Sequence, residues 1–376
     1  MPTIKSVTAL LVAYPEPHYR NIERYLVLVR IEDSSGQTGW GECISQFPEA
    51  TRATKALIDG GLSELLIGRA PMNIEGLWHA MLDRCFWYGS EGIAAFAISA
   101  IDMALWDLKG HLLGQPVASL LGGHVTDKVP AMASFILDMD DLDWTVNEFA
   151  MHQQSGFRIL KAGWGMTPDS QFGTNRERDL LLVDRIRAAV GYEVDVILDV
   201  AGHRRFWDLP TAIQRFNDLE PYRLRWIEQP LPSHDLAAHA KLRGAVTTPI
   251  GTGEDEWNPE SYKRLIESGG VDVVQLDPGR CLGITGCRQV LKMIEAANLD
   301  ASAHTWSSAL NTAASLHMLA NSPNHVGMDL KPHPSPMQHE LVTDPWVQVD
   351  GCVHLRDAPG LGVTVDEAVV AKYAWH

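Results

Sequence analysis

The sequence predicts an α/β protein in which one (β/α) barrel forms the larger domain, and three observations support this. From about Lys128 to Leu330, short apolar runs alternate with helical patterns. Five of these runs end in a carboxylate or an imidazole, spaced roughly one strand-plus-helix unit apart. The region before residue 125 reads instead as alternating strands followed by helices. We therefore expect an α+β domain and then a barrel whose strand ends meet at one mouth.

The N-terminal domain is predicted from apolar and polar residues that alternate near the start of the chain. VTALLVAY and YLVLVRIE flank the loop PEPHYRN, and the turn DSSGQT leads into GWGE. This order is typical of a small antiparallel sheet. Helical patterns follow over residues 50–82 and 94–123, and glycines punctuate the end of the second.

Eight apolar runs are predicted to be barrel strands, because buried parallel strands are nearly continuous in apolar residues. They are VPAMAS, FRILKAG, VDVILDV, RLRWIEQ, TPIGTGE, VDVVQLD, DASAH and HVGMDL. Residues 344–376 have strand-and-turn character. The predicted domains are a capping domain (1–125), a barrel (126–340) and a C-terminal segment (341–376) that packs back on the capping domain.

Composition narrows the class of partner. The chain has 376 residues and a formal charge of −16, which argues against nucleic acid and favours a hard cation. No run of 18 apolar residues is present, so we expect no membrane span. The five cysteines are scattered without zinc-site spacing, and the first residues lack a secretory pattern. We expect reduced thiols in a cytoplasmic protein that acts on a small molecule.

Three carboxylates, Asp199, Glu228 and Glu254, end consecutive predicted strands. Crowded carboxylates raise one another's pKa, and a bound cation relieves that repulsion. Oxygen-only ligation suits Mg²⁺ better than Zn²⁺. The alternative is that all three are ordinary surface acids. Asp255 and Glu256 lie beyond the apolar run, so we expect them in a loop and not among the ligands.

The next two strand ends supply a candidate catalytic pair. Asp277 would orient the ring of His304, whose other nitrogen is then a general base. Lys161 ends FRILK and would stabilise negative charge on a substrate oxygen, although a solvated strand-end lysine is the alternative. Trp164 either lines the pocket or packs under a loop.

Taken together, these segments resemble the mandelate racemase branch of the enolase superfamily over nearly the whole chain. GWGE and AISAIDMALWDLKGHLLGQPVASLLGG are similar to its capping domain, and ILDV, WIEQP, GTGE, LDPGRCLGITG and AHT to its strand ends. The resemblance implies a modified (β/α)7β barrel with an α+β cap, Mg²⁺ on the three carboxylates, an Asp277–His304 dyad, and a homo-oligomer, either a dimer or an octamer. For this superfamily, Mg²⁺ with a Lys or His base stabilising an ene-diolate is already established.

One departure from the family pattern bears on the reaction. The branch's Lys-x-Lys motif reads Lys161-Ala162-Gly163 here, so racemisation by two opposed bases is disfavoured. His304 alone can remove an α-proton and then protonate a departing β-hydroxyl on the same face. With YGSEG, PYRLRWIEQPL and HTWSS, the chain is most similar to rhamnonate dehydratase and related acid-sugar dehydratases. We predict syn dehydration of an aldonic or aldaric acid to a 2-keto-3-deoxy acid.

The resemblance also implies substrate contacts. Asp329 matches in position a glutamate that binds the substrate carboxylate, with a loop-facing acid as the alternative. His18, Tyr19 and Arg20 correspond to a segment that covers the substrate, unless they form a plain exposed loop.

Three other functions remain open at this point. An epimerase or cycloisomerase of the same superfamily would use the same proton abstraction. A metal-dependent hydrolase or glycosidase barrel would use paired carboxylates. A non-catalytic binding protein would keep the fold without turnover.

Overall fold

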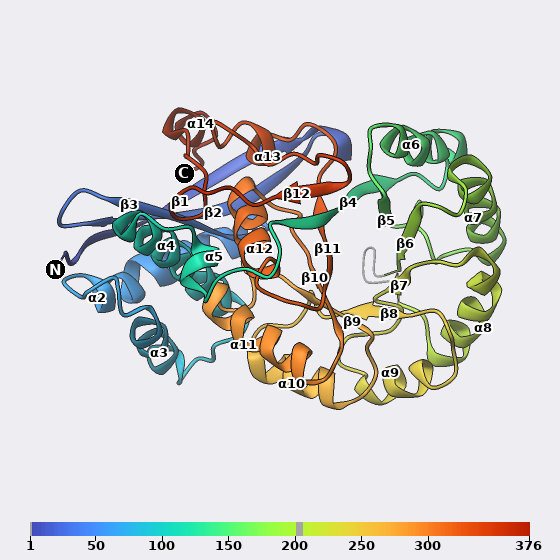
Figure 1. Ribbon diagram of the computed structural model, residues 1–376, viewed down its shortest axis with the longest axis horizontal. Coiled ribbons are helices and arrows are strands. Elements are labelled where there is room, and N and C mark those ends of the chain that lie inside the picture. Colours follow the sequence, from blue (N-terminus) through green and yellow to red (C-terminus); the bar gives the residue numbers. More distant parts are fainter. Residues whose placement is uncertain (1, 201–205) are drawn as a thin grey trace.

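A computed structural model describes residues 2–200 and 206–376. Eight parallel strands of this part of the chain form a closed barrel, because β11 pairs with β4 as well as with β10 (Figure 1). They are β4 (Lys128–Leu137), β5 (Ile159–Gly165), β6 (Asp195–Asp199), β7 (Trp226–Glu228), β8 (Ile250–Thr252), β9 (Val273–Leu276), β10 (Asp300–Ala303) and β11 (His325–Leu330). Each predicted run overlaps one of these strands, so the barrel prediction is confirmed.

Within the described residues, one α-helix longer than a single turn lies in each connection between successive barrel strands, seven in all, and together they surround the barrel (Figure 1). They are α6 (Leu142–Gln154), α7 (Arg176–Val190), α8 (Leu209–Leu219), α9 (Leu236–Arg243), α10 (Pro259–Glu267), α11 (Gly283–Ala296) and α12 (Ala309–Leu319). A 3-10 turn, η4 (Glu220–Tyr222), follows α8. Six of the seven begin at a side chain that accepts a backbone N–H, as Asp141 does from Trp144. The last strand, β11, leads only into the short α13 (Pro336–His339), which gives the expected (β/α)7β order.

The interior of the barrel is apolar at one level and charged at the next. Its buried apolar cluster consists of Met132, Ile159, Ile197, Trp226 and Val273. Side chains two residues further along a strand point the same way. Two residues beyond Ile159 on β5 is Lys161. In the same way, Asp199 and Glu228 pair two residues beyond the paired Ile197 and Trp226. The strand ends therefore present charged groups to the barrel mouth above an apolar floor.

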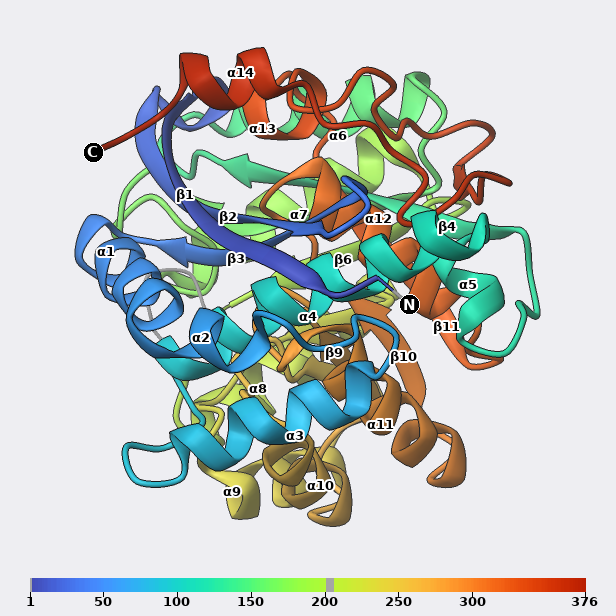
Figure 2. The same ribbon diagram turned by 90° about the vertical axis from the view of Figure 1, so that its left-hand side faces the viewer.

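The N-terminal domain is a three-stranded antiparallel sheet covered by helices (Figure 2). Its strands are β1 (Ile4–Glu16), β2 (Ile22–Asp33) and β3 (Thr38–Gln46), with the 3-10 turn η1 (Pro17–Tyr19) between the first two. Its helices are α1 (Pro48–Leu57), the π-helical η2 (Ile58–Leu62), α2 (Ser63–Leu66), α3 (Ile74–Cys85), α4 (Ile93–Leu113) and α5 (Val117–Leu120). A Cβ at Gly39 or Gly41 would collide with the backbone of α4, so these two glycines of GWGE let sheet and helix approach closely.

The C-terminal segment returns to the N-terminal sheet. Trp375 N–H donates to the Leu11 carbonyl at 2.9 Å, and Ala13 N–H donates to the Tyr373 carbonyl at 2.9 Å. Figure 2 shows α14 (Glu367–Lys372) beside β1. The segment also contains β12 (Cys352–His354), which pairs antiparallel with β4. Helix α14 differs from the predicted strand-and-turn character, and the Asp366 side chain caps it by accepting the Ala368 N–H.

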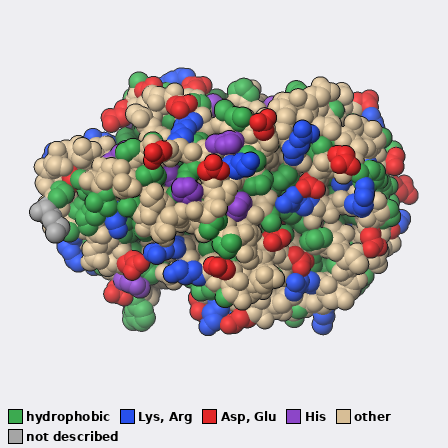
Figure 3. Space-filling view, in the orientation of Figure 1, with side chains coloured by type: hydrophobic (Ala, Val, Ile, Leu, Met, Phe, Trp, Pro, Cys, Tyr) green, Lys and Arg blue, Asp and Glu red, His purple; other side chains and the backbone are tan. Residues whose placement is uncertain are grey.

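The surface gives little indication of which class of partner binds. Acidic and basic side chains are interspersed on the face that Figure 3 shows, with no broad basic patch there. None of the helices in the described ranges combines the length and the apolar character needed to cross a bilayer.

Candidate active site

A cavity of about 160 Å³ lies between the barrel mouth and the N-terminal domain. The barrel contributes charged groups to its wall, among them Lys161, Asp199, Glu254, Asp277, His304 and Asp329. The N-terminal domain contributes Tyr19, Arg24, Ile44 and Gln46. The cap therefore completes a pocket whose reactive groups come from the strand ends.

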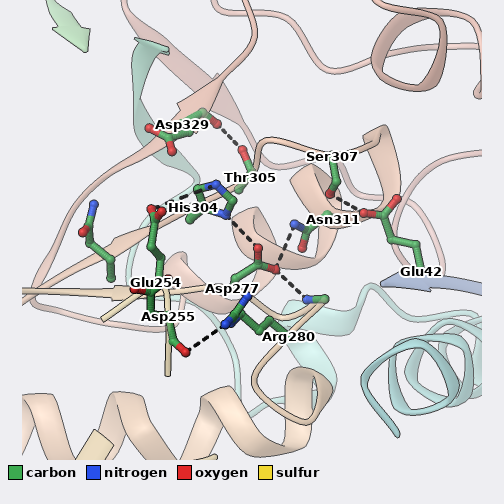
Figure 4. Close-up of polar contacts among 12 residues, drawn as sticks. Glu42, Glu254, Asp255, Asp277, Arg280, His304, Thr305, Ser307, Asn311 and Asp329 are labelled. Carbon is green, nitrogen blue, oxygen red and sulfur yellow. Dashed lines mark hydrogen bonds and ion pairs between the residues drawn. The ribbon is translucent and has the colours of Figure 1, made fainter. Parts of the chain in front are cut away.

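His304 and Asp277 form a hydrogen-bonded pair (Figure 4). The two are joined at 2.7 Å between His304 Nδ1 and Asp277 Oδ2. The other carboxylate oxygen accepts the Gly279 N–H at 2.7 Å and the Asn311 amide at 3.1 Å. With both oxygens engaged, Asp277 cannot rotate freely, and it fixes the ring so that Nε2 is directed away from it. Glu254 Oε2 lies 4.0 Å from that Nε2.

Opposing influences set the pKa of His304. Burial lowers it, but the Glu254 carboxylate and the hydrogen bond to Asp277 raise it further, to about 9. Burial in turn raises the pKa of Glu254 to about 7. The charge of each group shifts the pKa of the other. A cation bound to Glu254 would therefore lower the pKa of His304.

Lys161 is a buried residue of the cavity wall and lies among carboxylates. Its Nζ is 2.5 Å from Glu228 Oε1 and donates to Asp329 Oδ2 at 3.2 Å. Burial lowers the pKa of Lys161, but the surrounding carboxylates, Asp329 first, outweigh it and hold that pKa well above its usual range. The surrounding carboxylates thus favour the charged form of Lys161.

Gly163 has no room for a side chain. A Cβ there would collide with the Asp199 carbonyl oxygen and lie 2.6 Å from the Asp199 nitrogen. The backbone of β6 therefore fills the position where the family motif carries its second lysine. A residue larger than glycine at this point would require β5 and β6 to separate.

The three predicted metal ligands lie at neighbouring strand ends. Asp199 pairs with Glu228 in the barrel register, and Glu254 follows β8. Asp199 and Glu228 are buried. Within the described ranges, only His18, Glu148 and His333 form a group of three such side chains with one ligand atom each inside 4.8 Å of the others. The strand-end carboxylates stand further apart than this, with the Lys161 ammonium between Glu228 and Asp329.

The predicted substrate contacts separate into two groups. Tyr19, Trp164 and Asp329 line the cavity, and Asp329 is buried, unlike the loop-facing acid that was its alternative. His18 and Arg20 are not among the described lining residues. Arg20 Nη2 instead donates to Asp138 Oδ2 at 3.3 Å on the surface. His18 faces another cluster of ionisable side chains, described below.

Comparison with known proteins places this architecture in a family. Residues 19–122 match the model described as "Mandelate racemase / muconate lactonizing enzyme, N-terminal domain". Residues 145–369 match the model described as "Enolase C-terminal domain-like". The chain belongs to the enolase superfamily, in its mandelate racemase branch. This agrees with the resemblance carried by GWGE, WIEQP and the other strand-end segments.

Relatives of this superfamily enzyme differ in the reactions they are named for. The chain is 31% identical to D-galactonate dehydratase of Ralstonia pickettii, covering 94% of this chain and 92% of that one. It is 27% identical to D-galactarolactone cycloisomerase of Agrobacterium fabrum, over 92% and 90%. A racemase structure from Streptomyces coelicolor, with bound magnesium, superposes with a TM-score of 0.86 at 27% identity, over 99% and 100%.

The donor set of this superfamily member fits Mg²⁺ in its chemistry. Glu254 Oε2 is buried and makes no hydrogen bond in the described structure, whereas the buried Glu228 Oε1 is paired with the Lys161 ammonium at 2.5 Å. All three candidate ligands offer carboxylate oxygen, the donor that Mg²⁺ prefers. A cation would have to draw these carboxylates closer than they now stand. Its charge would also lower the pKa of Glu254, which burial and then the neighbouring carboxylates Glu228 and Asp255 raise.

Sequence reasoning missed several residues around the cavity. Arg24 and Arg280 line it, and so does Trp306, over whose ring the Arg24 guanidinium lies at 5.0 Å. None of the three stands at a strand end or in a spacing that signals a ligand. Arg24 comes from β2, far from the barrel in sequence.

Glu42 of GWGE has a role that the motif alone did not reveal. The Ser307 hydroxyl donates to Glu42 Oε1 (Figure 4). The Ser308 N–H donates to the same oxygen at 3.4 Å. Burial raises the pKa of Glu42 to about 7. Because Ser307 follows His304 by three residues, the cap holds the segment that carries the candidate base.

Proposed function

We propose that this enzyme is a Mg²⁺-dependent dehydratase of a polyhydroxy acid, aldonic or aldaric. The observation that carries the proposal is a single acid–base group, the Asp277-oriented His304, facing a cavity rich in carboxylates. Dehydration needs a base on one face of the substrate only. The D-galactonate dehydratase relative supports the same reaction class.

His304 performs both proton transfers in the proposed mechanism. A cation on the neighbouring carboxylates would lower the pKa of His304 from about 9 and so free its Nε2 to take the proton from C2 of the substrate. The Asp277 carboxylate stabilises the imidazolium that results. The C3–O bond then breaks, and the same imidazolium gives its proton to the departing hydroxyl, which leaves as water. The enol product takes up a solvent proton at C3 and becomes a 2-keto-3-deoxy acid.

Other residues stabilise charge and position the substrate. We infer that Asp199, Glu228 and Glu254 hold Mg²⁺, which when bound supplies positive charge to the substrate carboxylate as the C2 proton leaves. Lys161, whose charged form Asp329 and its neighbours favour, is proposed to add to that stabilisation. Tyr19, Trp164 and Asp329 line the cavity and are proposed to contact the substrate.

Further expectations follow from the proposal. The partner is a small molecule, and we expect no nucleic acid to bind. We also expect the chain to self-associate, which sedimentation at several concentrations would measure.

The test is a screen of stereoisomeric aldonates and aldarates with Mg²⁺ present, with keto-acid products detected by semicarbazide. A 2-keto-3-deoxy product from one substrate is the expected result. Run in deuterium oxide, the reaction should place deuterium at C3 of that product. If no member of a broad panel yields such a product, the proposed function is wrong.

A second candidate is cycloisomerisation of a related lactone, favoured by the likeness to D-galactarolactone cycloisomerase. It also begins with proton abstraction by one base, so His304 serves equally. A cycloisomerase would convert a lactone without release of water, which mass spectrometry of the product distinguishes from dehydration. Epimerisation is less compatible, because the opposite face lacks a lysine at Gly163.

A further inference from the structure

A second group of ionisable side chains lies where the N-terminal domain meets the barrel. We call His18, Glu148, His152 and His333 the seam cluster. His18 belongs to η1 of the cap, and Glu148 and His152 lie four residues apart on α6. His333 follows β11. The cluster therefore joins three segments that are remote in sequence, and the proposed reaction uses none of its members.

The ligand-type atoms of the seam cluster lie around Glu148 Oε2. Glu148 Oε2 lies 2.6 Å from His333 Nε2, 3.5 Å from His152 Nε2 and 4.0 Å from His18 Nε2. The Nε2 atoms of His152 and His333 are 3.1 Å apart. In a tetrahedral zinc site with bonds of about 2.0–2.1 Å, neighbouring ligand atoms are separated by about 3.3 Å. The observed separations scatter around that value.

Glu148 lies at the centre of the cluster, on a residue that is only 9% exposed. Its Oε2 pairs with His333 Nε2 at 2.6 Å, and the Nε2 atoms of His152 and His18 face it at 3.5 and 4.0 Å. Carboxylate oxygen and imidazole nitrogen are both donors to Zn²⁺, so these atoms together offer a donor set for one ion.

We propose that the seam cluster is a second metal site, selective for a transition ion of the Zn²⁺ class. His18, Glu148 and His333 are its ligands, with one atom each inside a 4.8 Å group. His152 Nε2 lies beside Glu148 and His333 but outside that group, so it would complete a tetrahedral set by moving toward the ion. Imidazole nitrogen suits Zn²⁺, Co²⁺ or Ni²⁺ and not Mg²⁺, so the two sites select different ions.

The site would fasten the cap over the cavity. Tyr19, which lines the cavity, is the next residue after His18. His18 Nε2 also lies 3.3 Å from the carbonyl of Ile136, another lining residue, in a hydrogen bond that it would give up on binding the ion. An ion shared by η1, α6 and the segment after β11 would therefore restrict opening of the loop beside the substrate. Its role is to hold the loop, without contact with the reacting atoms.

Zinc titration by calorimetry tests the proposal, with protein first treated with chelator and Mg²⁺ kept in large excess. We expect one Zn²⁺ per chain. His18→Gln and His333→Gln should each weaken binding by more than about a hundredfold, because each removes a direct ligand. His124→Gln, which changes an exposed histidine elsewhere, should bind as the unmodified protein does. Equal zinc affinity in all three variants would overturn the site.

Two further measurements use the unmodified protein. Co²⁺ added in place of Zn²⁺ should give the intense visible bands of tetrahedral coordination, and their absence would contradict the geometry. Zn²⁺ should also slow amide hydrogen exchange over residues 18–21 in the unmodified protein and not in His333→Gln. If Glu254→Gln abolishes zinc binding while His333→Gln leaves it intact, the ion binds at the barrel mouth and the proposal is wrong.

Discussion

The barrel mouth and the seam cluster both gather histidines and carboxylates beside the cavity, but they are built differently. At the mouth, oxygen donors outnumber imidazoles, and Lys161 lies among Asp329, Glu228 and Glu254. In the seam cluster three imidazoles surround one carboxylate. The mouth therefore favours a hard cation and acid–base chemistry, whereas the seam favours a borderline ion and a fixed loop.

The two regions also differ in how the fold assembles them. Successive strands of one barrel place Asp199 beside Glu228, and a single connection places His304 next to Asp277. The seam cluster needs η1 of the cap to meet α6 and the end of β11. The barrel mouth follows from the geometry of neighbouring strands. The seam cluster forms only when the N-terminal domain is docked on the barrel.

The largest expected effect is a loss of kcat in a variant at the barrel mouth, the proposed reaction site. Replacing His304 by Asn removes the base and keeps the size of the side chain close to that of the ring. We expect kcat to fall by about a thousandfold, since general acid–base groups contribute about 10²–10⁴-fold. Steady-state kinetics on the substrate found in the aldonate screen measures it. Zinc binding at the seam cluster should be unchanged in this variant, and near-normal turnover would remove His304 from the mechanism.

Gly163→Ala tests whether close packing of β5 against β6 excludes any side chain, and therefore a second base, at this position. A Cβ there meets the backbone of Asp199, so we expect a loss of about 1–3 kcal/mol of unfolding free energy. Gly60→Ala is the matched control, because a Cβ at Gly60 meets nothing within 4 Å. Urea denaturation of the two variants gives the comparison. Equal stability of both would show that β5 can accept a side chain at that position.

The pKa of His304 tests the charge balance at the mouth. In metal-free protein we expect it near 9, as imposed by Glu254 and Asp277. A pKa raised above that of the unfolded chain stabilises the fold fully below about pH 6.5, and this stabilisation is lost as pH rises through about 9. Mg²⁺, and separately Asp277→Asn, should lower the pKa of His304. NMR titration of the ring protons measures it, and a pKa indifferent to both changes would contradict the proposed metal position.

Arg20→Ala, next to the seam, should have the smallest effect. Arg20 is mostly exposed and pairs with Asp138 at 3.3 Å, and such surface pairs contribute about 0–1 kcal/mol. We expect little change in the unfolding free energy or in KM. Thermal unfolding and substrate titration check both. A large rise in KM would instead return Arg20 to the substrate site that the family resemblance implied.

The strands could be predicted because burial on both faces leaves a continuous apolar signal. FRILKAG overlaps β5 and contains Lys161, and VDVVQLD overlaps β9 and ends at Asp277. The helix α14 was missed because it is only six residues long, too short for a clear helical pattern. Arg24 and Glu42 were missed as site residues because their positions at the cavity depend on how the cap docks.

The amino-acid sequence by itself determined the barrel, the order of its strand ends and the pairing of Asp277 with His304, because neighbouring parallel strands bring their ends together wherever the barrel closes. Only the tertiary structure decided that Gly163 is closed off by the backbone of β6, that Lys161 stands between carboxylates, and that His18 turns toward Glu148 and His333. These depend on distances between segments remote in the chain, which no local pattern of residues encodes.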